Sequence, residues 1–254
     1  MLDIKIIKCL TDNYSYLLRD KETNTVAVVD PSEADPIDFE IQKTYKRLDY
    51  ILNTHHHIDH IGGNSSLKRK YNSKIICSSI DNKKISDADI LKNDNDIFSL
   101  GKTEFKTIHI PGHTLGHVAF YSQIENVVFT GDTLFSLGCG KIFEGTFKDM
   151  FGSLEKLKKI SKNTKIYCGH EYTKKNAEFC LKIDNENQKL KERTNEINES
   201  IKKRMPTIPV SLKTELETNV FLRCDDTKIK NYLKMNKSNK LEVFTELRKL
   251  KDSF

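Results

Sequence analysis

Four side chains that can bind metal stand within six positions of the sequence: His55, His57, Asp59 and His60. His55 and His57 are two residues apart, so in an extended segment both imidazoles project to one side. Asp59 and His60, which follow, can then serve a second ion. Imidazole nitrogens and carboxylate oxygens are ligands of zinc and similar divalent metals. Because so many clustered imidazoles would repel one another when protonated, the pattern predicts a metal site.

Three further candidate ligands lie later in the chain: His113 in the segment 111–117, Asp132 in the segment 129–132, and His170 in the segment 168–171. A glycine directly precedes each of them, where the absence of a Cβ lets the chain turn sharply. Each also follows an apolar run of strand character. We therefore expect four strand ends to converge on one edge of the fold and to assemble the site from distant parts of the sequence.

Seven ligands are too many for one tetrahedral ion, but a carboxylate can bridge two ions. The sets that we predict are His55, His57 and His113 for one ion and Asp59, His60 and His170 for the other, with Asp132 shared. The remaining histidines are expected to have ordinary structural roles. Of these, His56 should point away from the ions, His109 should lie on a strand, and His117 is a candidate for contact with the ligands.

A pair of divalent ions about 3.5–4 Å apart can lower the pKa of a shared water from about 15.7 toward roughly 7. The hydroxide that results would be the nucleophile, and the same ions would polarise the carbonyl under attack. Asp59 and Asp132 are the catalytic residues that we predict beside that hydroxide. No serine or cysteine nucleophile is required, so the residues predict metal-assisted hydrolysis.

Short apolar runs of strand character recur through the first two thirds of the chain. We expect strands at 4–9, 14–18, 25–29, 50–52, 74–77, 105–110, 117–121, 127–130 and 165–168. A helix is expected at 149–160, and apolar residues at helical spacing predict helix within 173–204 and 240–250. The sequence thus predicts mixed sheets covered by helices, an α/β (α+β) fold, with one domain at 1–172 and a smaller helical domain at 173–254.

The composition indicates a solvated globular protein, with 37% hydrophobic and 31% charged residues among 254. No apolar run approaches the roughly 20 residues that span a bilayer, and no secretory signal is visible. Six scattered cysteines without a CxxC pair suggest free thiols, so we expect a cytoplasmic protein without a membrane partner. We interpret the net charge of +6 as a lysine-biased surface rather than a nucleic-acid site.

The motif from Thr54 to His60, with the later His, Asp and His, resembles the metallo-β-lactamase superfamily. That resemblance implies an αββα sandwich with metals at one edge of the paired sheets. It does not name a substrate, because the superfamily includes lactamases, lactonases, nucleases and thioesterases.

Narrower segments are similar to the glyoxalase II (hydroxyacylglutathione hydrolase) family: 111–117, 129–135, 138–146, 169–173 and the basic end 248–254. The resemblance implies hydrolysis of S-(2-hydroxyacyl)glutathione thioesters, chiefly S-D-lactoylglutathione to glutathione and D-lactate, in methylglyoxal detoxification. It also implies two divalent ions. We expect zinc, with iron or manganese as alternatives, and we expect a monomer.

By the same resemblance, a set of residues would bind the glutathione part of the substrate: Lys141, Phe143, His170, Tyr172, Arg248 and Lys251. Arg248 and Lys251 are three apart, which puts both cations on one helix face. The sequence departs from the family at Phe143, where tyrosine is common, and at Val220, where proline is usual. The first departure removes a hydroxyl hydrogen bond, so weaker glutathione binding is expected.

Two alternatives remain open at the level of sequence. One is another metal enzyme of the same fold, such as a nuclease or a persulfide dioxygenase with mononuclear iron, although the complete second set of ligands argues against a single iron. The other is a non-catalytic nucleic-acid binder, which the positive net charge suggests and the full ligand set opposes.

Overall fold

Strands rich in β-branched residues build the first of two units in the computed structural model, which describes residues 1–254. This unit comprises residues 1–109 and 115–131. Its first sheet has six strands in sequential order: β1 (Leu2–Cys9), β2 (Asn13–Asp20), β3 (Val26–Val29), β4 (Tyr50–Leu52), β5 (Lys74–Ser78) and β6 (Ile90–Lys92). The pairs β1–β2 and β2–β3 are antiparallel, and the pairs from β3 to β6 are parallel. The sheet is therefore mixed, as expected.

The other strands of this unit form an antiparallel meander: β7 (Ile97–Leu100), β8 (Thr103–His109), β9 (Val118–Ser122) and β10 (Val127–Gly131). Every residue of β9 and β10 is buried. The ring of Phe129 on β10 lies 5.3 Å from that of Tyr16 on β2. The two sheets of the unit therefore face each other across an aromatic core.

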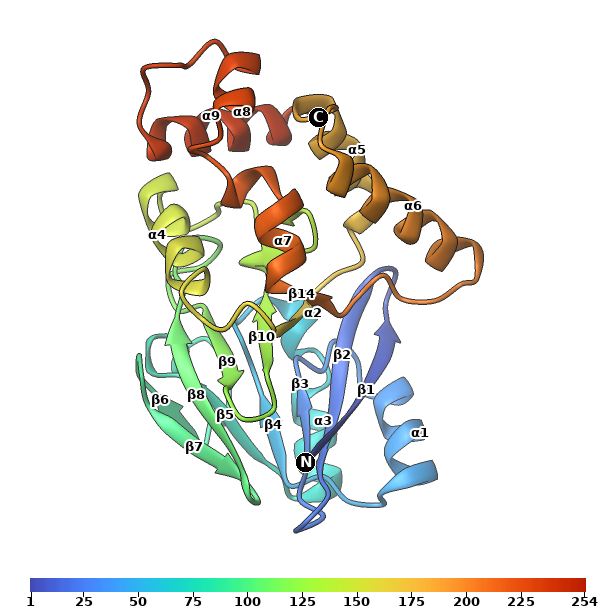
Figure 1. Cartoon of the computed structure of the whole chain (residues 1–254). Helices are drawn as coiled ribbons and strands as arrows, with labels where there is room; N and C mark the ends of the chain where they lie inside the picture. Colours follow the sequence, from blue (N-terminus) through green and yellow to red (C-terminus); the bar gives the residue numbers. More distant parts are fainter. The chain divides into compact units, whose positions relative to one another are not determined.

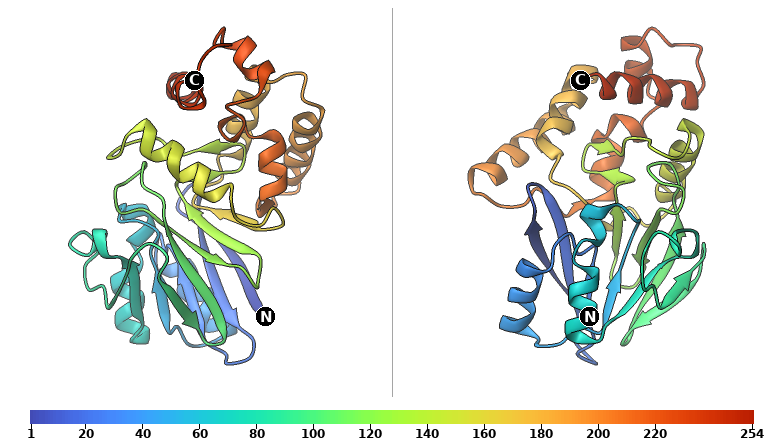
Figure 2. Two further views of the ribbon diagram at one scale, coloured as in Figure 1. Left: turned by 60° about the vertical axis from the view of Figure 1, so that its left-hand side comes forward. Right: turned by 180° about the vertical axis from the view of Figure 1, so that it is seen from behind.

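Helices α1 (Asp35–Thr44) and α3 (Asn64–Tyr71) cover the outer face of the first sheet, and the short helix α2 (Ile58–Ile61) and the 3₁₀ turn η1 (Ser79–Asp81) follow β4 and β5 in the chain. Ile37 and Ile41 of α1 and Leu67 of α3 belong to one buried cluster with Val28 and Ile51 of the strands. Both helices lie against this sheet in Figures 1 and 2. Helix, sheet and sheet thus form three successive layers of the first unit.

The second unit comprises residues 110–114 and 132–254 and is mainly helical, with its helices drawn from yellow to red in Figure 1. Its helices are α4 (Phe147–Leu157), α5 (Thr173–Ile183), α6 (Gln188–Lys202), α7 (Leu212–Thr218), the 3₁₀ turn η2 (Val220–Leu222), α8 (Thr227–Tyr232) and α9 (Lys240–Asp252). Its strands are β11 (Leu134–Phe135) paired with β12 (Gly138–Cys139), and β13 (Lys165–Cys168) paired with β14 (Val210–Ser211). Within the unit α5 packs against α6, and α4 packs against α9.

Local sequence explains where several of these helices begin. Thr146 and Asp149 form a capping box at the start of α4, as do Asn239 and Glu242 at the start of α9. In such a box the two side chains satisfy backbone N–H groups that the first helical turn leaves without partners. None of the helices has the length and apolar character needed to cross a bilayer.

All nine predicted strands are present, and five short ones were not predicted: β6, β7, β11, β12 and β14. The predicted helix at 149–160 starts two residues earlier and ends three residues earlier, and the stretch 173–204 is two helices separated by residues 184–187. The predicted domain boundary between residues 172 and 173 rests on the change from strand-rich to helix-rich sequence at that point. The two compact units have different bounds, and the predicted boundary stays a prediction.

Candidate metal centre

The first unit brings its predicted ligands together in the segment that follows β4. The Nε2 atom of His55 lies 3.1 Å from the Nδ1 atom of His57, and both side chains come from the same extended segment. Two nitrogen ligands of one tetrahedral zinc ion, each bound at about 2.0–2.1 Å, lie about 3.3 Å apart. The spacing of these two atoms is therefore that of two ligands on one ion.

A buried carboxylate orients this segment. Asp30, which follows β3, accepts the backbone N–H and the hydroxyl of Thr54 at 2.7 and 2.6 Å, and its Oδ2 lies 3.0 Å from Nδ1 of His60. The hydroxyl of Thr54 in turn lies 3.1 Å from Nδ1 of His55. A histidine that donates Nδ1–H to such a partner keeps its Nε2 lone pair for a metal. Asp30 thus fixes the ring orientation of His60 directly and that of His55 through Thr54.

Asp59 and His60, predicted to serve the second ion, stand at the start of the short helix α2. Oδ2 of Asp59 lies 3.6 Å from Nε2 of His60, and the amide of Asn13 donates to both the backbone oxygen and Oδ2 of Asp59 at 3.0 Å. Sequence reasoning missed both Asn13 and Asp30. Asp30 ends the apolar run of β3, and its place at a strand end was the one signal available for it.

The second unit brings together the other three predicted ligands. Oδ2 of Asp132 lies 3.5 Å from Nε2 of His113 and 3.3 Å from Nε2 of His170. All three side chains are buried, with exposed fractions of 4–6%. One carboxylate oxygen therefore lies near both of the histidines that were assigned to different ions.

The orientation of His113 is set by the chain that follows Asp132. Nδ1 of His113 lies 2.8 Å from the backbone oxygen of Lys141. Because a carbonyl oxygen only accepts, Nδ1 carries the proton and Nε2 keeps its lone pair. The tautomer that a metal ligand needs is thus imposed by a backbone contact.

The predicted ligands within each unit lie at distances that suit ligands of divalent metals. The ligand atoms within each unit approach one another at 3.1–3.6 Å, and carboxylate or backbone oxygens contact the other nitrogens of His60 and His113. Clustering of this kind leaves buried imidazole and carboxylate groups facing one another, which is favourable only with a cation among them or with shared protons.

The glycine before Asp132 is required by close approach. Gly131 has φ +46°, and a Cβ built on it would lie 2.4 Å from Oγ1 of Thr54 and 2.8 Å from Cε1 of His117. The His117 ring stacks on that of His55, with centroids 4.6 Å apart. Any side chain at residue 131 would therefore displace the segment that carries the first ligands.

Two family models together span almost the whole chain. The model of the metallo-beta-lactamase superfamily matches residues 10–170, and that of the hydroxyacylglutathione hydrolase C-terminus matches residues 171–254. A hydroxyacylglutathione hydrolase of Pelagibacter ubique is 50% identical over 253 residues, covering 100% of both chains. The chain belongs to the hydroxyacylglutathione hydrolase family.

Solved structures agree with this family on the fold. ETHE1 from Myxococcus xanthus matches with a TM-score of 0.70 at 20% identity, over 97% of this chain and 90% of its own. The B3 metallo-beta-lactamase BLEG-1 matches with a TM-score of 0.68 at 20% identity, over 88% of this chain and 100% of its own. The chain therefore has the predicted metallo-β-lactamase fold, with a helical C-terminal region, and the fold implies that it binds divalent metal.

Aromatic and basic residues that were predicted to bind glutathione lie in the second unit. The ring of Tyr172 stacks on that of His170, with centroids 4.7 Å apart and planes 5° apart. Phe143 is 61% exposed, and its ring packs edge to face against that of His113, with centroids 5.1 Å apart. Nζ of Lys141 lies 5.6 Å from the centroid of the Phe143 ring. Within the unit, therefore, Tyr172 and Phe143 each lie against a predicted ligand.

Arg248 and Lys251 share one face of α9, as their spacing predicted. Arg248 is only 5% exposed, its Nη1 donates to the backbone oxygen of Cys139 at 2.7 Å, and its Nη2 lies 3.0 Å from Asp252. Lys251 donates to the backbone oxygen of Lys175, and burial followed by the charge of Arg248 lowers its pKa. Arg248 thus makes structural contacts, and its role in substrate binding stays a prediction.

The other histidines have partners of their own. Nδ1 of His56 lies 3.2 Å from Oδ2 of the buried Asp81, and Nε2 of His109 on β8 donates to the backbone oxygen of Leu115. These placements match the structural roles expected for both residues.

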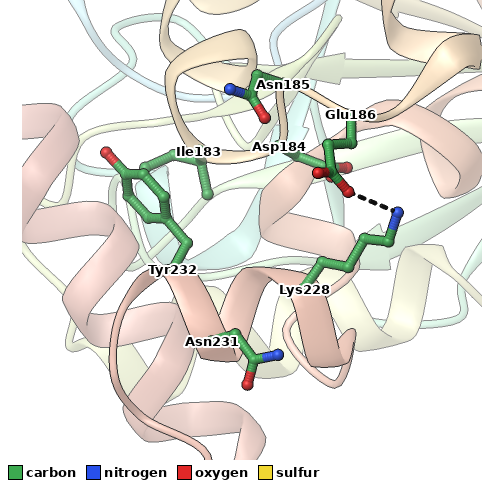
Figure 3. Close-up of a pocket in the computed structure, with 7 residues that line it drawn as sticks. All are labelled: Ile183, Asp184, Asn185, Glu186, Lys228, Asn231 and Tyr232. Carbon is green, nitrogen blue, oxygen red and sulfur yellow. Dashed lines mark hydrogen bonds and ion pairs between the residues drawn. The ribbon is translucent and has the colours of Figure 1, made fainter.

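A cavity of about 250 Å³ lies between α5 and α8 (Figure 3), and the charged side chains that line it pair with other charged side chains. Lys228 pairs with Glu186 at 3.1 Å, and the buried Asp184 pairs with Arg223. None of the predicted site residues lines this cavity, so we do not include it in the candidate site.

Proposed function

We propose that the chain hydrolyses S-(2-hydroxyacyl)glutathione thioesters, chiefly S-D-lactoylglutathione to glutathione and D-lactate. The names of its relatives support the reaction. The site geometry supports it through one observation above all, the position of Asp132 Oδ2 within 3.5 Å of both His113 and His170. We further propose a cytoplasmic monomer that uses no nucleic-acid or membrane partner.

We propose two divalent ions, zinc by preference, held by the seven predicted ligands. His55, His57 and His113 would hold one ion, and Asp59, His60 and His170 the other, with Asp132 between them. When bound, such ions supply a nucleophilic hydroxide at neutral pH and polarise the thioester carbonyl. Iron and manganese accept the same donors, so metal analysis decides among them.

The protein groups have distinct tasks in this reaction. Asp30 and the backbone oxygen of Lys141 hold His60 and His113 in the tautomer that binds metal. No protein thiol competes as nucleophile, because all six cysteines are buried, and burial raises the pKa of Cys168 and Cys180 to about 12. The leaving thiolate comes from a thiol of ordinary pKa near 8.5, so it departs without a strong general acid.

We propose that glutathione binds through residues of the second unit: Lys141, Phe143, His170, Tyr172, Arg248 and Lys251. The cations would face the glutathione carboxylates, since ammonium and guanidinium groups make strong charge-assisted hydrogen bonds with carboxylates. Lys141 and Lys251 would carry most of this attraction, because Arg248 already pairs with Asp252.

The test is a thioesterase assay with lactoylglutathione on the parent and two variants, each loaded with metal. Asp132→Ala should lose nearly all activity together with bound metal, and Lys141→Ala should mainly raise KM. Asp225→Ala serves as a matched control, because Asp225 pairs with Lys240 at the surface, and it should keep full activity. Full activity in Asp132→Ala would refute the bridging role. Cleavage of RNA in place of the thioester, or salt-dependent RNA binding without turnover, would favour the alternatives.

A further inference from the structure

The chain between Asp132 and Lys141 is a very short hairpin. Its strands β11 and β12 have two residues each, and only Leu134 with Cys139 and Phe135 with Gly138 are paired. A hairpin of this length is not stable alone in water. Since it connects a predicted metal ligand to a predicted substrate-binding lysine, its position must be fixed by other parts of the unit.

Side chains from the helical region hold this hairpin by its backbone. We call them the hairpin clamp, which consists of Asn176, Cys180, Glu215, Asn219 and Arg248. The backbone oxygens of four successive residues each accept from the clamp: Ser136 from Asn176 at 3.1 Å, Leu137 from Cys180 at 3.1 Å, Gly138 from Asn219 at 3.1 Å and Cys139 from Arg248 at 2.7 Å.

Glu215 on α7 is the centre of the clamp. Its Oε2 accepts the backbone N–H of Leu137 at 2.8 Å and the amide of Asn219 at 2.9 Å, and its Oε1 accepts the hydroxyl of Ser136 at 3.1 Å. The side chain is fully buried. A buried carboxylate is unfavourable unless it is hydrogen-bonded, and two of these three bonds come from the turn of the hairpin.

The position of the hairpin passes directly to the predicted site. The N–H of Gly140 donates to the backbone oxygen of Thr133 at 3.1 Å, and a Cβ built on Gly140 would lie 1.9 Å from the backbone oxygen of Asp132. On the following residue, the backbone oxygen of Lys141 accepts from His113. A shift of the hairpin would therefore move Asp132, Lys141 and the partner of His113 together.

We propose that Glu215 is a positioning residue: through the hairpin it sets Asp132, His113 and Lys141 for metal and substrate binding. The inference rests on the proposed function. A misplacement of about 1 Å in a catalytic group can cost roughly a hundredfold in rate, so a clamp remote from the metal has a large effect on the reaction.

The experiment compares Glu215→Ala with Glu215→Gln. In Glu215→Gln the amide oxygen can accept from Leu137 and Asn219, and the amide nitrogen can donate to the hydroxyl of Ser136, so the clamp is preserved. Glu215→Ala removes all three bonds. We expect the affinity for Zn²⁺ to fall about tenfold in Glu215→Ala and KM for lactoylglutathione at saturating zinc to rise about tenfold. Glu215→Gln should keep both the zinc affinity and KM of the parent.

A destabilised control separates positioning from stability. Ile229 on α8 is fully buried and bonds to no group of the hairpin, so Ile229→Ala should lower the unfolding midpoint while zinc affinity and KM stay at parent values. If Glu215→Ala does not fold, Asn176→Ala removes the single bond to Ser136 and should shift both quantities in the same direction by less.

The proposal is overturned if folded Glu215→Ala or Asn176→Ala keeps the zinc affinity and KM of the parent. A parent enzyme that binds zinc but does not cleave lactoylglutathione would instead defeat the proposed function. Zinc affinity would still test the clamp in that case, because it is measured without substrate.

Discussion

Asp30 and His60 form a buried pair in which Oδ2 of the carboxylate lies 3.0 Å from Nδ1 of the imidazole. The same carboxylate holds Thr54, the residue that precedes His55. Removal of such an outer partner typically lowers metal affinity about 10- to 100-fold. We expect a loss of this size in Asp30→Asn, measured by competition with a chromophoric chelator, and recovery of most activity when zinc is in excess.

Asp20 provides the matched control for this prediction. It is also a fully buried acid of the first unit, but its carboxylate accepts from Thr23, Thr103 and the backbone of Lys102, far along the chain from the ligands. Asp20→Asn should therefore lower stability without changing zinc affinity. Equal zinc affinities in Asp30→Asn and the parent would show that Asp30 does not orient a ligand.

Phe143 stands where the family commonly has tyrosine, and it is 61% exposed beside His113 and Lys141. A restored hydroxyl can make one more hydrogen bond to glutathione, which is worth about 0.5–1.5 kcal/mol. We expect Phe143→Tyr to lower KM for lactoylglutathione about two- to tenfold while kcat stays unchanged, because the bond forms equally in the ground and transition states. Steady-state kinetics with purified protein measure this.

Phe39 on α1 is a suitable comparison, since it is 69% exposed on the first unit. Phe39→Tyr adds the same hydroxyl far along the chain from the predicted glutathione residues and should leave both constants unchanged. A KM in Phe143→Tyr equal to that of the parent would place residue 143 outside the glutathione site.

Much of the fold was predictable, and candidate ligands could be named, because both depend on short local patterns. The nine predicted strands are apolar runs whose period and flanking turns lie within ten residues, and the ligands from His55 to His60 lie in one segment. The missed strands are too short to carry such a signal: β11, β12 and β14 have two residues each. Tertiary contacts define them.

The side chains that orient the predicted ligands were not predictable, because their contacts form only when segments distant in the sequence come together in the fold. Asp30 acts on His60 from 30 residues away, and Glu215 acts on Leu137 from 78 residues away. A lone Asp or Glu in the sequence is more often a surface residue than a buried acceptor. Arg248 illustrates the same point, since its spacing with Lys251 predicted a cationic face but not its bond to Cys139.

Glu215 also predicts a pH dependence of stability. Burial raises its pKa from 4.5 to about 7, against the lowering effect of the Leu137 and Asn219 hydrogen bonds and the charge of Arg193. Between pH 4.5 and 7 the unfolded chain is ionised at this residue while the folded chain stays protonated, so the folded state binds more protons and stability falls as pH rises. The pKa shift corresponds to about 3 kcal/mol of folding stability. This stability is lost as the pH rises from 4.5 to about 7, and the free energy of unfolding then no longer changes through Glu215 above pH 7.

The measurement is the free energy of unfolding in urea at pH 5 and pH 8 for the parent and for Glu215→Gln. Residue 215 of the variant does not titrate, and the other ionisable groups are shared, so their contributions cancel in the difference between the two proteins. The stability of the parent relative to the variant should therefore decrease by about 2.5 kcal/mol from pH 5 to pH 8. A difference that is independent of pH would mean that Glu215 is ionised throughout, held by Leu137 and Asn219 despite its burial.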